Sequence, residues 1–215
     1  MYKLYNVKAW GSLSIHCLLE EMEVPYTNIW MTAEQVRAPE FREISPLGLI
    51  PALGLDDGRT MIESAAIVSF LTTAHPEKGM APEPGSSDHG EFLSWLHFLS
   101  TEIYPFCEFT FPGNAFAMDD KHGPFVVDRA NERINRCWQI VENRLQGEGP
   151  WMMGETYSAL DIYAFMLSLW AQPSETDLLA CFPAVANLAA GVRARPMLKA
   201  PLEAHGVMAP GGYGS

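Results

Sequence analysis

The segment SPLGLIPALGLDDGRTMIES, residues 45–64, contains the residue types and spacing that most clearly suggest ligand binding. Pro51 stands at the head of a predicted strand, where a residue without an N–H group cannot join the hydrogen-bond ladder. A cis Ile50–Pro51 bond would turn the chain sharply and expose the N–H and C=O groups of Ile50. Those groups could pair with an extended peptide as though it were an added strand. Because only about 5–6% of X-Pro bonds are cis, the hypothesis needs support from the surrounding elements.

Glu63 and Ser64 stand at the start of a predicted helix, whose free N–H groups and dipole favour an anion. A carboxylate could bind to the hydroxyl and N–H groups of Ser64, and Glu63 could accept an ammonium group beside it. Together they would recognise the head group of an α-amino acid. The alternative is a plain N-cap, in which one of the two side chains only satisfies helix donors.

The first 75 residues around these positions follow the order β-α-β-α-β-β-α, which predicts a thioredoxin-like domain. The signals are alternating aromatic and β-branched residues for strands, apolar residues at i, i+3, i+4 and i+7 for helices, and an Asp-Gly hairpin turn. The expected elements are strands at 2–7 and 26–31, helices from near 12 to before 25, at 33–43 and at 64–74, and two strands on either side of 56–58.

Residues 76–90 are rich in Pro, Gly and Ser and predict a linker between two domains. Residues 91–215 predict an all-α second domain. We expect a long helix over 91–111, ended or kinked at Pro105, an amphipathic helix at 125–145, and a helix apolar on every side at 159–171. Ser158 and Asp161 have the spacing of a capping box at the start of that last helix.

Composition excludes several classes of protein. The chain has 215 residues and a net charge of −12, so a polyanion such as nucleic acid is not an expected partner. Its longest apolar runs are well below the ~18 residues of a membrane span. The N-terminus lacks a signal-peptide pattern, which predicts a cytoplasmic protein. The four cysteines and six histidines show no ligand spacing, so we predict no metal site.

Taken jointly, SPLGLIPAL, ESAAI, a linker after about 75 residues and SALD before a buried helix resemble the cytosolic glutathione transferases over nearly the whole chain. This resemblance implies that Ile50, beside Pro51, binds the cysteinyl part of glutathione through its backbone. It also implies that Glu63 and Ser64 bind the γ-glutamyl head. Arg37 is the best match for the residue that holds the glycyl carboxylate, and its alternative is a solvated surface arginine.

An enzyme of this family must stabilise the glutathione thiolate, because a thiol with a pKa near 8.5 is only a few per cent ionised at neutral pH. A hydroxyl donor and the N-terminus of the first helix would do so. WGSLSIHCLLEE resembles bacterial beta-class members, with Gly11 where they have a cysteine. Ser12 follows it and also matches the serine of theta-like members, four residues before a basic side chain, here His16. We predict Ser12 as the activating residue, with Ser14 as the alternative; Ser12 could also only cap the helix.

The second substrate is expected to be apolar and electrophilic. The resemblance implies a pocket between the first loop and the long helix of the second domain, although each aromatic residue could equally belong to the core. The residues concerned are Trp10, Tyr104, Phe106, Phe109 and Phe111. The family pairs as two-fold homodimers, and His97 could reach the glutathione of the neighbouring subunit.

The predicted function is conjugation of glutathione, a co-substrate, to such an electrophile. Glutathione-dependent isomerisation, dehalogenation, ether cleavage or peroxide reduction on the same fold are the first alternatives. Because Gly11 replaces the cysteine, chemistry through a mixed disulfide at that position is less favoured. A non-catalytic glutathione-binding protein is the remaining alternative.

Overall fold

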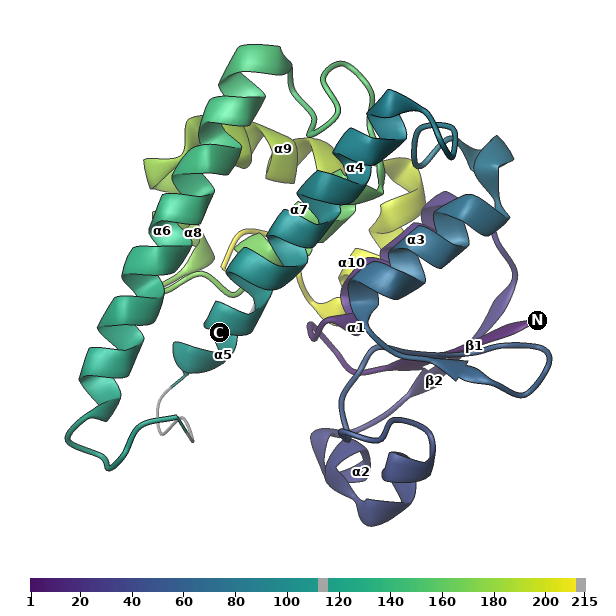
Figure 1. Ribbon diagram of the computed structural model, residues 1–215, viewed down its shortest axis with the longest axis horizontal. Coiled ribbons are helices and arrows are strands. Elements are labelled where there is room, and N and C mark those ends of the chain that lie inside the picture. The colour runs from purple at the N-terminus through teal and green to yellow at the C-terminus, as the bar shows by residue number, and fades with distance from the viewer. Residues whose placement is uncertain (112–115, 212–215) are drawn as a thin grey trace.

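A computed structural model describes residues 1–111 and 116–211 and begins with a four-stranded mixed sheet in the order β2-β1-β3-β4 (Figure 1). The inner strand β1 pairs in parallel with β2 and antiparallel with β3, which pairs antiparallel with β4. The strands are β1 (Tyr2–Asn6), β2 (Tyr26–Trp30), β3 (Ala52–Gly54) and β4 (Thr60–Met61).

Helices cover both faces of this sheet, with α1 and α3 on one face and α2 on the other (Figure 1). Their bounds are α1 (Ser12–Glu21), α2 (Ala33–Arg37) and α3 (Ser64–Ala74). The order confirms the thioredoxin-like prediction. The helix expected over 33–43 stops at Arg37 and continues as a 3-10 turn, Pro39–Glu43, because a residue before proline is driven out of the helical region. Ala38 has the extended angles φ −63° and ψ 143°.

Alternation along the strands divides the apolar residues between two clusters. Leu4 and Leu53 belong to the large core under α1 and α3, whereas their neighbours Tyr5 and Ala52 face a smaller cluster with Val36 of α2. Successive side chains of a strand point to opposite faces, so both faces of the sheet must be covered. The segment that carries α2 and Pro51 is therefore fixed by a core of its own.

The second part of the chain is all helical, as predicted. Pro105 lies in the first turn of α5, after a π-helical turn at Leu99–Ile103, so the expected break of the long helix is confirmed. The helices are α4 (Ser87–Phe98), α5 (Tyr104–Phe109), α6 (Gly123–Glu148), α7 (Ala159–Ser168), α8 (Glu175–Cys181), α9 (Pro183–Arg193) and α10 (Lys199–His205), with 3-10 turns at Pro76–Lys78 and Pro196–Leu198.

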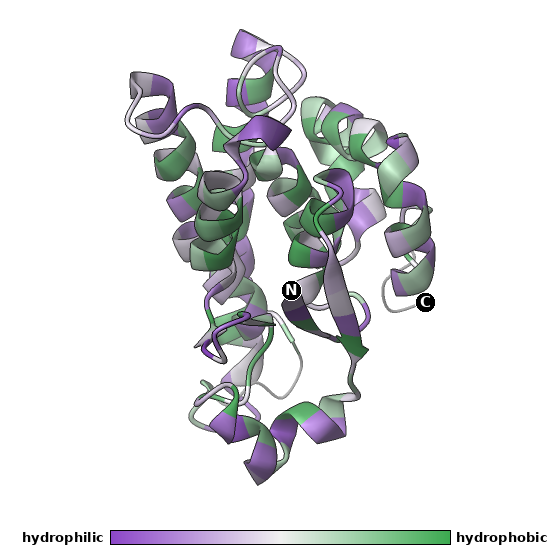
Figure 2. Ribbon diagram, turned by 90° about the vertical axis from the view of Figure 1, so that its right-hand side faces the viewer, coloured by the Kyte–Doolittle hydropathy of each residue, from purple (hydrophilic) through white to green (hydrophobic). Residues whose placement is uncertain are grey.

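One apolar core runs through both parts of the molecule. Every residue of α7 is buried, as its apolar sequence predicts, and Figure 2 shows hydrophobic and hydrophilic residues interspersed along the other helices. Met80, inside the segment predicted as a linker, is buried and accepts a hydrogen bond of 2.8 Å from the N–H of Ala159. Because α4 already begins at Ser87, the ordered helix overlaps the end of that segment. No helix in the described residues is long and apolar enough to cross a membrane.

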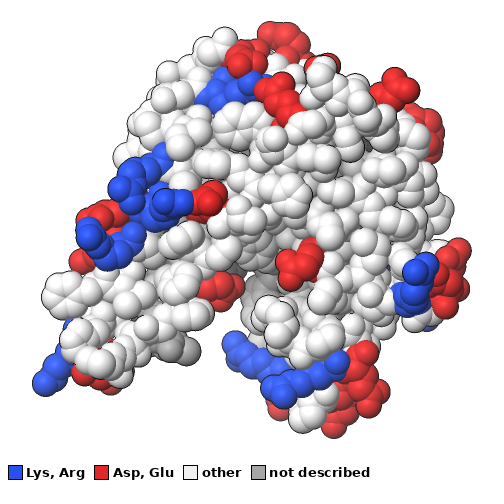
Figure 3. Space-filling view, in the orientation of Figure 1, with Lys and Arg blue, Asp and Glu red and all other residues white. Residues whose placement is uncertain are grey.

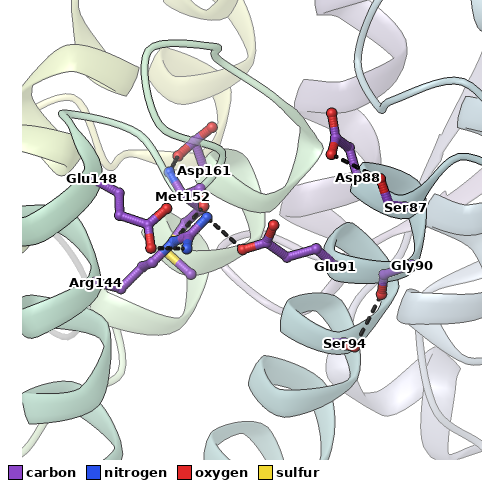
Figure 4. Close-up of polar contacts among 9 residues, drawn as sticks. All are labelled: Ser87, Asp88, Gly90, Glu91, Ser94, Arg144, Glu148, Met152 and Asp161. Atoms are coloured by element: carbon purple, nitrogen blue, oxygen red, sulfur yellow. Dashed lines mark hydrogen bonds and ion pairs between the residues drawn. The ribbon is translucent and has the colours of Figure 1, made fainter.

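A polar network joins α4, α6 and the start of α7 (Figure 4). Arg144 pairs with Glu91 at 2.8 Å and with Glu148 at 2.6 Å, and its Nε donates to the carbonyl of Met152 at 3.2 Å. The N–H of Met152 in turn donates to Asp161 at 2.7 Å. Only 9% of the Arg144 side chain is exposed, whereas the Glu91 and Glu148 side chains are 43% and 57% exposed, so a buried arginine joins the three elements to partners at the surface.

Candidate functional site

The turn before β3 is built as the sequence suggested. The Ile50–Pro51 bond is cis, and both residues are buried. Within the described residues, no hydrogen bond is recorded to the N–H or C=O of Ile50. β3 begins only at Ala52, so Pro51 does not interrupt the ladder, and the backbone groups of Ile50 remain open to an extended ligand.

The hairpin leads from this turn to the start of α3. Leu53 pairs with Met61 and Gly54 with Thr60 in antiparallel order. The cis-proline turn, just before Ala52, and the start of α3, just after Met61, therefore lie at the same end of the β3–β4 hairpin. The sequence predicted both features, and the antiparallel pairing is what brings them together.

Glu63 and Ser64 depart from a plain N-cap. Glu63 is exposed and has φ 69° and ψ 107°, and its side chain makes no capping hydrogen bond to the helix. A positive φ at a residue other than glycine costs free energy and is concentrated at ligand sites. Ser64 is buried, and its hydroxyl lies 2.6 Å from that of Tyr163 on α7. The N–H groups of the first turn of α3 therefore lack a side-chain cap and suit an anion.

The loop between β1 and α1 holds both predicted serines. Ser12 is fully buried, and its hydroxyl accepts from the Val7 N–H at 3.1 Å and lies 3.3 Å from the Val7 carbonyl, to which it can donate. The Ser14 hydroxyl donates to the carbonyl of Gly11 at 2.9 Å. Both hydroxyls thus bind the backbone of the loop rather than facing the cis-proline turn.

Two side chains of the second domain form hydrogen bonds with the backbone of the same loop at Ala9, which has φ 56°. The indole N–H of Trp170 donates to the Ala9 carbonyl at 2.9 Å, and the Ala9 N–H donates to Nδ1 of His205 at 2.9 Å. Sequence reasoning missed both residues, because the contacts join positions more than 150 residues apart and leave no local pattern.

His16, the histidine four residues after Ser12, lies in the interior of the protein. The His16 ring is buried in the core, 3.0 Å from the ring of His205, and burial lowers its pKa. Burial also lowers the pKa of His205 to about 3, with smaller contributions from His16 and Lys8. Both imidazoles are therefore neutral at pH 7, because a charged ring here would lose its hydration.

Tyr104 is the first residue of α5, and its side chain lies next to the start of α1. A Cβ atom on Gly11 would overlap the Tyr104 hydroxyl, and it would lie 3.0 Å from Cζ of that ring and 3.4 Å from Cδ of Pro51. The phenol is therefore next to both the first turn of α1 and the cis-proline turn. Its ring packs against Trp170 at 5.0 Å and Tyr163 at 6.4 Å between centroids.

The other aromatic residues predicted for one pocket lie in separate places. Phe106 and Phe109 line a cavity of about 380 Å³ with residues of α6. Trp10 packs against the small cluster under α2, and Phe111 is half-buried. Residues two and five positions after Tyr104 point to another side of a helix, which explains why the two phenylalanines turn away from Gly11. Phe106 and Phe109 thus share one cavity with α6, and a common pocket with Trp10, Tyr104 and Phe111 stays a prediction.

Arg37 and His97 are both exposed. Arg37 ends α2, and Figure 3 shows basic and acidic side chains together on the lobe that carries α2. The same view shows a hollow between that lobe and the one formed by α5 and the start of α6.

Family models match most of the described chain. Residues 12–74 match the glutathione S-transferase N-terminal domain, and residues 115–205 match the glutathione S-transferase C-terminal domain. The chain belongs to the glutathione S-transferase family. The family and fold predicted from the sequence are thereby confirmed.

Two proteins similar to this chain carry different names within the family. Glutathione S-transferase GST-4.5 of Xanthomonas campestris is 24% identical over 176 residues, covering 82% of this chain and 85% of the relative. Disulfide-bond oxidoreductase YfcG of Escherichia coli is 29% identical over 206 residues, covering 91% and 92%.

Solved structures agree over almost the entire chain. A glutathione transferase from Methylococcus capsulatus has a TM-score of 0.84 at 28% identity and covers 96% of this chain and 100% of its own. A sphingomonad glutathione S-transferase complexed with glutathione has a TM-score of 0.81 at 26% identity and covers 95% and 99%.

Proposed function

We propose that this protein conjugates the glutathione thiolate to an apolar electrophile. The observation that carries the proposal is the cis Ile50–Pro51 turn at the same hairpin end as the uncapped start of α3 at Glu63 and Ser64. An open backbone beside an α-amino-acid site suits the cysteinyl and γ-glutamyl parts of one tripeptide.

Each end of the peptide has a proposed partner. The Ile50 backbone pairs with the cysteinyl residue, the Ser64 N–H and hydroxyl bind the γ-glutamyl carboxylate, and Glu63 binds the ammonium group. Arg37 binds the glycyl carboxylate from the exposed end of α2. In a two-fold homodimer, exposed His97 reaches the glutathione of the partner subunit; light scattering should then give twice the chain mass.

The reaction needs the thiol proton to leave to solvent and the thiolate to attack an electrophilic carbon. With a chloronitroaromatic test substrate, a C–S bond forms, the C–Cl bond breaks and chloride departs. The N-terminal dipole of α1 favours the thiolate, and the sequence assigns the hydroxyl donor to Ser12 or Ser14. In either case the serine must first release its bond to Val7 or Gly11. We place the protein in the cytoplasm, where glutathione is abundant as a reduced thiol.

Calorimetric titration with glutathione, followed by turnover of the chloronitroaromatic, tests the proposal. Glu63→Gln removes the charge for the ammonium group, so we expect about tenfold weaker glutathione binding. Glu23→Gln is the matched control. Glu23 is also an exposed glutamate with a positive φ, 51°, but it follows the C-terminal end of α1. Absence of glutathione binding in the wild type would refute the proposal, and binding without turnover would favour a non-catalytic glutathione-binding protein.

Thiol–disulfide chemistry is a second candidate, favoured by the relative named as a disulfide-bond oxidoreductase. Burial raises the pKa of the Cys107 thiol to about 12 and also raises that of Cys17, so neither supplies a thiolate. In a form of this reaction that needs no protein thiol, two glutathione molecules reduce a disulfide substrate to two thiols and leave as oxidised glutathione. A product screen separates this outcome from conjugation, and from isomerisation, dehalogenation, ether cleavage or peroxide reduction.

A further inference from the structure

We infer that Glu108 makes this protein select, among apolar electrophiles, those that carry a positive charge over those that carry a carboxylate. The inference rests on the proposed function and names the class of its second substrate. A cationic group on the electrophile lies beside the Glu108 carboxylate while the reacting carbon faces the sulfur of glutathione.

The face of α5 on which Glu108 lies is the first observation. Tyr104 and Glu108 are four residues apart, so their side chains lie on the same face of that helix, one turn from each other. The Tyr104 hydroxyl is next to Gly11 and Pro51. A cysteinyl residue paired with the Ile50 backbone carries its sulfur close to the same place. Glu108 therefore lies on the helix face that borders the second substrate, and α5 lines the hollow of Figure 3.

The second observation is that the charge of Glu108 has no partner in the described part of the chain. Its side chain is exposed, and no hydrogen bond or ion pair to it is recorded among residues 1–111 and 116–211. Two arginines of the neighbouring helix α6 are already occupied, because Arg129 pairs with Glu132 at 2.7 Å and Arg133 pairs with Glu102. The carboxylate is therefore available to a ligand.

The negative charge of Glu108 also acts on the side chains around it. Burial is the largest cause of the raised pKa of Tyr104, and Tyr163 and Glu108 raise it further. Burial likewise raises the pKa of Cys107 to about 12, and Glu108 contributes to that shift as well. A carboxylate that disfavours negative charge on two neighbouring side chains also disfavours it on a substrate bound beside them, and it favours a cation.

Glutathione leaves this charge uncompensated. In the proposed complex Glu63 binds the ammonium group of the tripeptide, so that cation does not neutralise Glu108. The thiolate then adds a second negative charge on the same side of the substrate. A carboxylate on the electrophile meets two like charges, whereas an ammonium group is attracted to both.

Three chloronitroaromatic compounds that differ in one ring substituent, methyl, aminomethyl or carboxymethyl, test the inference. In each, the thiolate forms a C–S bond and chloride leaves. Each kcat/KM is divided by the rate constant of the same compound with free glutathione, which removes differences in intrinsic reactivity, including attraction to the thiolate. We expect the wild type to prefer the aminomethyl over the carboxymethyl compound by about tenfold or more. Added salt should reduce this preference, because the carboxylate is exposed.

Glu108→Gln keeps the size of the side chain and removes its charge, so the preference should fall by about fivefold or more. Glu108→Lys should lower it further, because the new charge attracts the carboxymethyl compound. Glu203→Gln is the matched control, since Glu203 is also an exposed glutamate on a helix of the second domain, α10, with no ion pair recorded in the described residues. This control should keep the preference of the wild type.

Two outcomes overturn the inference and leave the proposed function intact. The first is equal normalised rates for the three compounds with the wild type, and the second is an unchanged preference in Glu108→Gln. A wild type that does not turn over the methyl compound overturns the proposed function instead, and this inference with it.

Discussion

Gly11 shows how a single residue is constrained by a partner far away in the sequence. Its φ of −56° and ψ of −21° suit any amino acid, so the backbone does not require glycine here. The requirement comes from Tyr104, whose hydroxyl fills the space beside the glycine. The position thus accommodates either a side chain at 11 or the phenol of Tyr104, but not both without movement.

Gly11→Ala should therefore lower the free energy of unfolding by about 1–3 kcal/mol, because the new methyl group overpacks the site. In a Tyr104→Phe background the loss should be smaller by at least about 1 kcal/mol, since the clashing oxygen is gone. Urea unfolding of the wild type, both single variants and the double variant measures this coupling. Equal losses in the two backgrounds would show that the two residues do not meet.

At the scale of elements, two helices begin with the same pattern in different surroundings. Ser158 and Asp161 form the predicted capping box of α7, and Ser174 and Asp177 have identical spacing at the start of α8. Asp161 is fully buried and accepts from the N–H groups of Met152 and Ser158, both at 2.7 Å. Asp177 is exposed. The pattern defines a helix start, whereas burial decides how much the aspartate contributes to the free energy of unfolding.

Asp161→Ala should cost about 2–4 kcal/mol of stability, because it leaves buried donors without a partner. Asp177→Ala, the matched control, should cost less than about 1 kcal/mol, since water replaces the carboxylate. Burial raises the pKa of Asp161 to about 7, so denaturant unfolding is measured at pH 8, where the carboxylate is ionised. Similar losses for the two variants would contradict the argument from burial.

At the scale of the whole molecule, the second domain holds the loop between β1 and α1 of the first domain in place. Trp170 and His205 bind the two backbone groups of Ala9, and Tyr104 covers Gly11. α10 thus returns to the first domain and brings His205 against His16 in the core. Folding of the loop and docking of the second domain should therefore be one event.

Stability should depend on pH through this histidine pair. The pKa of His205 is about 3 in the folded protein and near 6.5 in the unfolded chain, so below pH 6.5 the unfolded state binds more protons. The pair's contribution is complete above pH 6.5 and declines as the pH falls toward 3. Each such histidine adds a slope of up to about 1.4 kcal/mol per pH unit.

His205→Asn should flatten that slope between pH 6.5 and 4.5 while keeping an acceptor for the Ala9 N–H. Val207→Ala, a buried neighbour that does not titrate, should lower stability equally at each pH. Urea unfolding at a series of pH values measures both effects. Parallel curves for the wild type and His205→Asn would exclude the pair as the source.

Much of the fold could be predicted from local sequence patterns, because these patterns arise from interactions between residues that are close in sequence. The strand and helix order, the break at Pro105 and the capping box at Ser158 follow from alternation, proline geometry and side-chain caps. The site was predicted only in part. Ile50 with Pro51 and Glu63 with Ser64 occupy positions that suit their proposed roles, whereas the burial of His16, which lowers its pKa, left no pattern in the sequence.

The sequence by itself determined the elements and the hairpin that we propose to bind glutathione, since all of that hairpin lies within twenty residues. Only the tertiary structure decided which side chains meet at the start of α1. Ser12 is turned toward Val7 by two local hydrogen bonds, and Tyr104 arrives from ninety positions away through the packing of α5 against Trp170 and Tyr163. The physical reason is that contacts between distant segments depend on how entire helices pack against one another. The spacing of residues along the chain does not show which helices will pack together.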